Sequence, residues 1–133
     1  MALNLIKKPT DLGLLILRVG FSGMMLSHGI PKINMFFQSP IKFADPIGLG
    51  ETTSLILTLI GEVLAPILVL VGFKTKWATI PVIITMLVAA FVVHLSDPFG
   101  TKEKALLYLF AFLAILIAGP GHYSYDGIKK HLN

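Results

Sequence analysis

The sequence predicts an all-α integral membrane protein, folded as an antiparallel four-helix bundle in a single domain over residues 1–133. Hydrophobic residues make up 55% of the chain and charged residues only 14%, a more apolar composition than that of soluble domains. The mean hydropathy of +0.83 agrees. Each of its apolar runs approaches the ~17–25 helical residues that cross a bilayer, and none carries the charged stripe of a soluble bundle helix. The runs cover residues 12–30, 52–73, 78–96 and 105–121.

The first run follows Lys7 and Lys8, as the apolar region of a secretory signal peptide does. Arg18 interrupts this run, however, and no small-residue cleavage site follows, so we expect a retained helix. The connector from Pro31 to Glu51 is rich in proline and glycine, which predicts that it is not one continuous helix. It reads equally well as a plain loop and as a lid over the mouth of the bundle.

The later runs are joined by the short connectors 74–77 and 97–104, which predict antiparallel neighbours. Gly119-Pro120-Gly121 ends the fourth run. Small residues recur at helical spacing on the first two runs, and such residues let membrane helices pack closely. We therefore expect two packing seams, one made by Gly20, Gly23 and Ser27 and the other by Ser54, Thr58, Gly61 and Ala65.

The charged residues argue against nucleic acid as a partner. The formal net charge is +4, yet the lysines are scattered over connectors and form no basic stripe. They are better interpreted as topology signals, and a modest excess on one side predicts that both termini are cytoplasmic. That side holds Lys7, Lys8, Lys74, Lys76, Lys129 and Lys130, against Lys32, Lys42, Lys102 and Lys104 on the other. The absence of cysteine from the sequence excludes disulfides and thiolate metal sites.

Two ionisable residues, Arg18 and Glu62, lie inside the apolar runs, where a charge indicates a partner or a function. Helical spacing aligns Arg18 with Ser22, Met25, Gly29 and Lys32 in one strip of the first span. We expect the Arg18 guanidinium to pair with the Glu62 carboxylate in the bundle interior. In the alternative, Arg18 reaches the cytoplasmic headgroups and Glu62 is protonated.

The backbone around Glu62 is expected to add a hydrogen-bond acceptor at the same depth in the membrane. Pro66 follows Glu62 by one helical turn and lacks the amide that would bond the Glu62 carbonyl. A free backbone acceptor is therefore expected beside the carboxylate.

His28 and His94 lie at the same offset from the starts of their spans, which predicts that both reach a similar depth near the outer surface. Two imidazoles at one level could ligate a metal or haem, or form a proton relay with Glu62. Their spacing matches no metal motif, so we predict no metal site and regard these histidines as the ligands if one exists.

Several motifs together resemble the DoxX family of small four-span membrane proteins. The resemblance rests on Leu17-Arg18-Val19-Gly20, His28-Gly29-Ile30-Pro31-Lys32, Gly61-Glu62-Val63, Gly72-Phe73, and Gly119-Pro120-Gly121 followed by Ser124 and Asp126. It implies a four-helix inner-membrane protein, and some relatives are described as subunits of quinone-linked oxidoreductases. Relatives carry Thr-Arg after the Gly-Phe pair, whereas this chain has Lys74-Thr75-Lys76, which keeps the charge without the bidentate geometry.

We expect an accessory or partner-recruiting subunit of a membrane oxidoreductase system that is not catalytic on its own. Its partners would be the lipid bilayer and a protein of a redox complex, and a homo-oligomer is left open. The alternative is a quinone-binding redox subunit, in which Arg18, Glu62, His28 and Lys32 hold the headgroup or move its protons. A third interpretation is a small proton-coupled transporter that uses Glu62.

Overall fold

The structure, a computed structural model, describes residues 8–132, and the side chains of residues 8–130. All regular secondary structure in this range is helical, which confirms the all-α prediction. Two segments, η2 and η3, are π-helical and continue α-helices without a break. The elements are α1 (Pro9–Phe36), α2 (Glu51–Leu59), η2 (Ile60–Leu64), α3 (Ala65–Val71), α4 (Thr75–Val88), η3 (Ala89–Val93), α5 (Phe99–Ala118) and α6 (Tyr125–Leu132).

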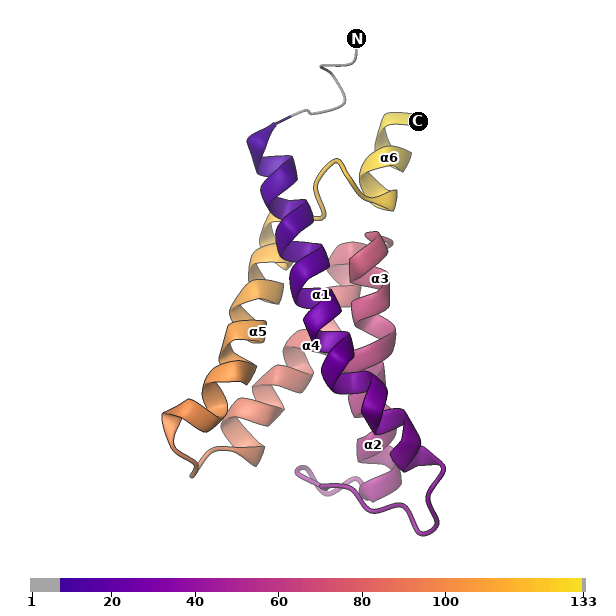
Figure 1. The fold of residues 1–133 in the computed structure, drawn as a ribbon, viewed down its shortest axis with the longest axis vertical. Helices are drawn as coiled ribbons and strands as arrows, with labels where there is room; N and C mark the ends of the chain where they lie inside the picture. The colour runs from indigo at the N-terminus through magenta and orange to yellow at the C-terminus, as the bar shows by residue number, and fades with distance from the viewer. Residues whose placement is uncertain (1–7, 133) are drawn as a thin grey trace.

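The long helical segments alternate in direction (Figure 1). The α1 helix and the α4–η3 helix run one way, whereas the α2–η2–α3 helix and α5 run the other way, and α6 lies at the end where α1 begins. The α1 helix packs on η2, α3 and α5, and α4 packs on the same three elements. The two helices α1 and α4 therefore lie at opposite corners, around a core that includes Met25, Val69, Val82, Phe112 and Ile115.

Among the described residues, three helices are long and apolar enough to cross a membrane: Pro9–Phe36, Glu51–Val71 and Thr75–Val93. The fourth long helix, α5, has 20 residues but carries Lys102, Glu103 and Lys104 near its start. Its crossing of the bilayer, and with it the four-span bundle, stays a prediction.

The α1 helix runs through Pro31 to Phe36, beyond the predicted end of the first run at residue 30, while residues 37–50 form no continuous helix, as predicted. A proline removes one amide donor, and a membrane helix tolerates that loss when neighbouring groups satisfy the freed acceptor. The α5 helix likewise begins at Phe99, ahead of the predicted start. These extensions matter for function because they place Lys32 and Lys104 on helices.

The two predicted packing seams have different outcomes. Ser54, Gly61 and Ala65 are buried, so the seam on the second span is confirmed. Gly20 and Gly23 are exposed, and a Cβ built on either would have no neighbour within 4 Å, so the seam on the first span is wrong. The α1 helix instead buries its polar strip, which comprises Arg18, Ser22, Met25 and Gly29.

Candidate functional site

Arg18 is a structural clamp and does not pair with Glu62. Only 1% of its surface is exposed, and its guanidinium donates hydrogen bonds to four backbone carbonyls. These belong to Val69 (3.1 Å), Leu70, Pro120 (3.3 Å) and Tyr123. The first two lie at the carboxyl end of α3, where the helix dipole favours a cation. The predicted Arg18–Glu62 pair is therefore wrong, and so is the alternative in which Arg18 reaches the headgroups.

Gly72 ends α3 beside the carbonyls that Arg18 binds. Its φ of 74° is left-handed. The Phe73 amide donates to the Leu68 carbonyl (2.9 Å), and the Gly72 amide donates to the carbonyls of Leu68 (2.9 Å) and Val69 (3.1 Å), as in a Schellman cap. A Cβ at Gly72 would collide with the side chain of Ser124 and lie 3.2 Å from Arg18 Nη1. The close approach of the tail therefore requires glycine here.

Asp126 ties the C-terminal segment to the start of α4. Its carboxylate accepts hydrogen bonds from the amides of Lys74 (3.0 Å) and Thr75 (2.8 Å) and from the Thr75 hydroxyl (2.9 Å). Its own amide donates to the Gly72 carbonyl at 2.9 Å. We call Arg18, Gly72, Ser124 and Asp126 the Arg18 clamp, because together they join α1, the α3–α4 turn and the tail.

The clamp makes stability depend on pH. Burial raises the pKa of Asp126, but the amides of Thr75 and Lys74 and the Thr75 hydroxyl outweigh this effect, so its pKa lies below the ordinary value. Because the pKa of Asp126 is lower in the folded protein than the ~3.9 of the unfolded chain, the ionised carboxylate stabilises the fold at pH values above ~3.9. This stabilisation is lost as the pH falls through the folded pKa.

We therefore expect Asp126→Asn to lower the free energy of unfolding by about 1–2 kcal/mol at pH 7, the size of a lost helix cap. The difference from the parent should shrink below about pH 4, where the parent carboxylate also becomes protonated. Denaturant titration in detergent at several pH values measures it. A difference that stays constant down to pH 2 would contradict the assignment.

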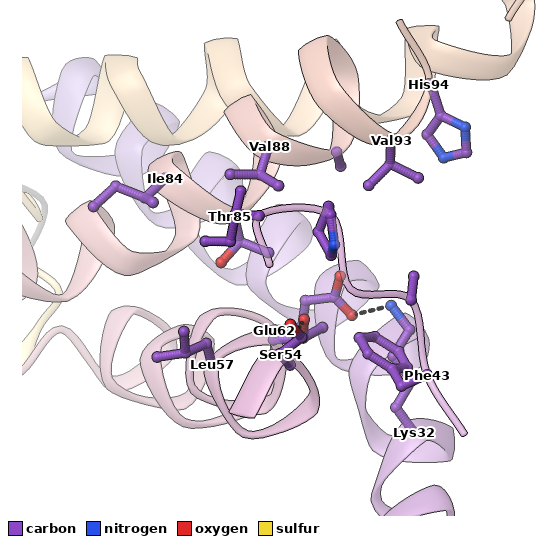
Figure 2. A pocket seen from close by; sticks show the side chains of 15 residues that line it. Lys32, Phe43, Ser54, Leu57, Glu62, Ile84, Thr85, Val88, Val93 and His94 are labelled. Carbon is purple, nitrogen blue, oxygen red and sulfur yellow. Dashed lines mark hydrogen bonds and ion pairs between the residues drawn. The ribbon is translucent and has the colours of Figure 1, made fainter. Parts of the chain in front are cut away.

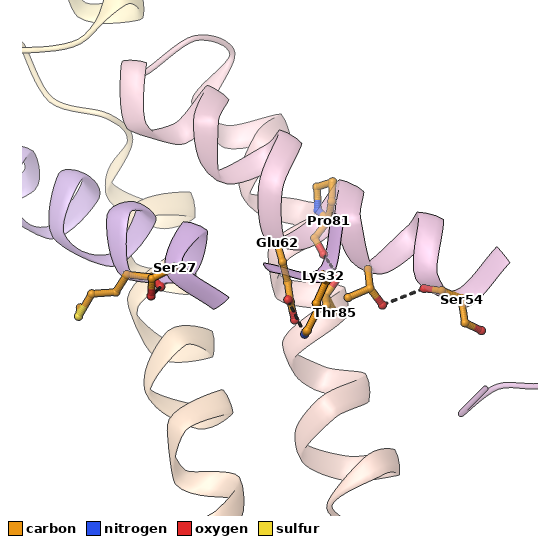
Figure 3. Close-up of polar contacts among 8 residues, drawn as sticks. Ser27, Lys32, Ser54, Glu62, Pro81 and Thr85 are labelled. Carbon is orange, nitrogen blue, oxygen red and sulfur yellow. Dashed lines mark hydrogen bonds and ion pairs between the residues drawn. The ribbon is translucent and has the colours of Figure 1, made fainter. Parts of the chain in front are cut away.

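Glu62 pairs with Lys32 at the other polar centre. Lys32 Nζ lies 2.6 Å from Glu62 Oε2, and only 6% of the Glu62 surface is exposed (Figures 2 and 3). Lys32 comes from α1 and Glu62 from η2, so the pair also joins two helices. A Glu62→Ala substitution therefore removes the carboxylate partner of Lys32. The sequence led us to expect that Arg18 would lose its partner instead.

The backbone of η2 is held between two neighbouring helices. A Cβ at Gly29 of α1 would lie 2.5 Å from the Glu62 carbonyl oxygen, and a Cβ at Gly61 would collide with Thr85 of α4. Thr85 in turn donates to the Pro81 carbonyl at 2.7 Å (Figure 3). The Glu62 carbonyl, which we expected to lack a hydrogen bond because of Pro66, thus faces α1. Single-turn π segments occur often at functional sites, and this one presents the Glu62 side chain.

Two cavities meet at the Lys32–Glu62 pair. One, of about 230 Å³, is largely apolar and lies between α2, the end of α4 and the connector residues Phe43 to Ile47 (Figure 2). The other, of about 370 Å³, has a more polar wall that includes His28, Thr101, Lys104 and Tyr108. Lys32, Glu62, Ala89 and His94 line both cavities. The pair therefore stands at the border between an apolar and a polar compartment.

The structure brings four of the five predicted site residues, His28, Lys32, Glu62 and His94, to one cavity and leaves Arg18 apart from them. The His28 ring packs edge-on against Tyr108, with centroids 5.8 Å apart. His94 Nδ1 lies 2.7 Å from Asp97 Oδ2. Among residues 8–130, no three His, Cys, Asp or Glu side chains gather as metal ligands would.

Sequence reasoning missed the contribution of α5 to the polar cavity. The sequence predicts Lys104 in the connector 97–104, whereas the structure places it on α5. Lys104 and Tyr108 are one helical turn apart, and Thr101 and Ala105 share the same spacing. This periodicity was a signal that could have placed Lys104 and Tyr108 on one helix face.

The fold and its apolar helices define a small α-helical membrane protein with two buried polar centres. The chain belongs to the DoxX family, because the DoxX family model matches residues 13–95. This range contains Arg18 and the Lys32–Glu62 pair, whereas the tail that completes the Arg18 clamp lies beyond it. Neither a search of the curated proteins nor a search of the solved structures found a match.

Proposed function

We propose that this protein is an accessory subunit of a quinone-linked oxidoreductase system in the inner membrane, and that the Lys32–Glu62 pair holds a quinone headgroup. The observation that supports this function best is the position of the pair, where an apolar cavity meets a polar one. A ligand with a polar ring and an apolar tail matches that division.

The residues around the pair have the chemistry that a quinone headgroup needs. Its two carbonyl oxygens require hydrogen-bond donors, which the Lys32 ammonium, the Tyr108 hydroxyl and the His28 ring supply. The apolar cavity beside Leu57, Ile84 and Val88 accommodates the start of the tail. A bound quinol supplies two electrons and two protons.

The chain's own residues move the protons. The Glu62 carboxylate accepts a proton from a ring hydroxyl, and Lys32 stabilises that carboxylate while it is ionised. The polar cavity then leads toward Thr101 and Lys104 at the start of α5, and it is large enough for several waters. We assign the electron acceptor to a partner protein, which makes this chain accessory.

We propose α5 as a fourth span, which gives the antiparallel bundle. The end with the Arg18 clamp then faces the cytoplasm. Lys8, Lys74, Lys76, Lys129 and Lys130 belong to that end, and Lys32, Lys42, Lys102 and Lys104 to the opposite end. This excess of lysine favours a cytoplasmic orientation. Lys7, which we counted on the same side, lies outside the described residues.

A binding experiment tests the headgroup site. We expect a short-tailed benzoquinone at 100 times its Kd to stabilise the purified protein by about 2.7 kcal/mol, measured as a rise in Tm in detergent. Glu62→Gln and Lys32→Gln should each remove most of this rise. Lys42→Gln is the matched control, because Lys42 is exposed and lines neither cavity. Equal rises in all four proteins, or none in the parent, would refute the site.

The accessory role needs a separate test. Crosslinking in native membranes followed by gentle solubilisation should recover a redox protein together with this chain. If the chain is always recovered alone while its quinone site is intact, the accessory role fails and the binding site remains.

A further inference from the structure

An apolar groove lies between the η2–α3 helix and the α4 helix. It has a volume of about 240 Å³, and its walls include Ile60, Leu64, Leu68, Ala78 and Pro81. At its end, by the α3–α4 turn, lie Phe73, Lys74 and Trp77. Lys74 is the charged residue in this lining, so the groove is apolar along its length and cationic at its mouth.

We infer that this groove binds one molecule of an anionic phospholipid, with an acyl chain in the groove and the phosphate at Lys74. The dimensions favour an acyl chain. The helical wall over residues 60–71 spans about 16 Å at ~1.5 Å per residue, which is about half of a ~30 Å hydrocarbon core. The groove therefore reaches from the membrane surface toward the middle of the bilayer.

The charge at the mouth favours an anionic headgroup. Lys74 is exposed and lines the groove, and its Nζ lies 6.0 Å from the centroid of the Phe73 ring. The nearby acid, Asp126, already accepts hydrogen bonds from the Lys74 and Thr75 amides and the Thr75 hydroxyl. Because Asp126 is engaged in this way, the Lys74 ammonium is available to a phosphate at the mouth of the groove.

Trp77 also lies at the mouth of the groove, beside Lys74. It is 76% exposed within the protein, and a tryptophan with an apolar ring and an indole N–H is suited to the headgroup region of a bilayer. It is also the single tryptophan of the chain. Its fluorescence therefore reports on the lipid at this groove without any label.

Quenching by brominated lipid provides the test. The protein is reconstituted into vesicles of phosphatidylcholine and phosphatidylglycerol, with bromine on the acyl chains of one lipid at a time. We expect brominated phosphatidylglycerol to quench Trp77 more than its mole fraction predicts. Lys74→Gln should lower this preference about fivefold, since a lysine near the surface contributes ~1 kcal/mol to anionic lipid binding. Lys74→Arg should keep it.

Two control variants separate a defined site from diffuse charge. Lys130→Gln removes the same charge from the same end of the molecule, but Lys130 lines a different cavity beside Asp11. Lys102→Gln removes it at the opposite end of the molecule. Both variants should retain the preference of the parent. Equal quenching by the two lipids in the parent, or a loss in Lys130→Gln as large as in Lys74→Gln, would overturn the inference.

Discussion

Replacement of Arg18 by methionine is expected to destabilise the protein by about 4 kcal/mol or more. The substitution leaves the carbonyls of Val69, Leu70, Pro120 and Tyr123 without their common donor. The Val69 carbonyl keeps the Gly72 amide as a donor, but each buried acceptor left without a partner costs ~1–3 kcal/mol, and the tail then loses its hold on α3. Denaturant titration in detergent micelles measures the change in the free energy of unfolding.

Two further substitutions show whether geometry or charge matters at Arg18. Arg18→Lys keeps the charge but cannot reach carbonyls on both sides of the clamp, so it should recover only part of the loss. Lys42→Met removes an exposed cation from the connector that follows α1 and should cost little. If Arg18→Met is no more harmful than Lys42→Met, Arg18 does not clamp the fold.

Gly29→Val should be the second most harmful change and should reach the candidate site. A Cβ at Gly29 would lie 2.5 Å from the Glu62 carbonyl oxygen and 2.8 Å from its carbon. These are backbone atoms that cannot rotate away, so α1 must move away from η2. We expect a loss of about 2–4 kcal/mol in the free energy of unfolding, together with weaker benzoquinone binding as Lys32 is drawn from Glu62.

Gly23→Val is the matched control for this prediction. Gly23 lies on the same helix, but a Cβ there would meet nothing within 4 Å. The control should therefore keep the Tm and the benzoquinone affinity of the parent. Similar losses in the two variants would show that helix propensity, and not the approach of η2, explains the effect at Gly29.

The sequence predicted the features that depend on local pattern. Helical periodicity placed Arg18, Ser22, Met25 and Gly29 on one face of α1, and the structure buries all of them. The same reasoning located a polar centre with Glu62, His28 and His94, which the structure brings to one cavity. Composition and run length predicted the four long helical segments but not α6.

The partners of the two charges could not be predicted from local pattern. Arg18 binds carbonyls of the tail that lie more than 100 residues away in sequence, and nothing in the first span signals that the tail folds back. Axial counting placed Arg18 and Glu62 within reach of each other, but it ignores which helix face each side chain occupies. The continuation of α1 past Pro31 then supplied Lys32 as the closer cation for Glu62.

The separation of the two polar centres is tested most directly by a double-mutant cycle on the free energy of unfolding. Lys32→Gln combined with Glu62→Gln should show a coupling energy of about 1 kcal/mol or more, because the pair is in contact. Arg18→Lys combined with Glu62→Gln should be additive within about 0.5 kcal/mol. Strong coupling between Arg18 and Glu62, with none between Lys32 and Glu62, would contradict this account.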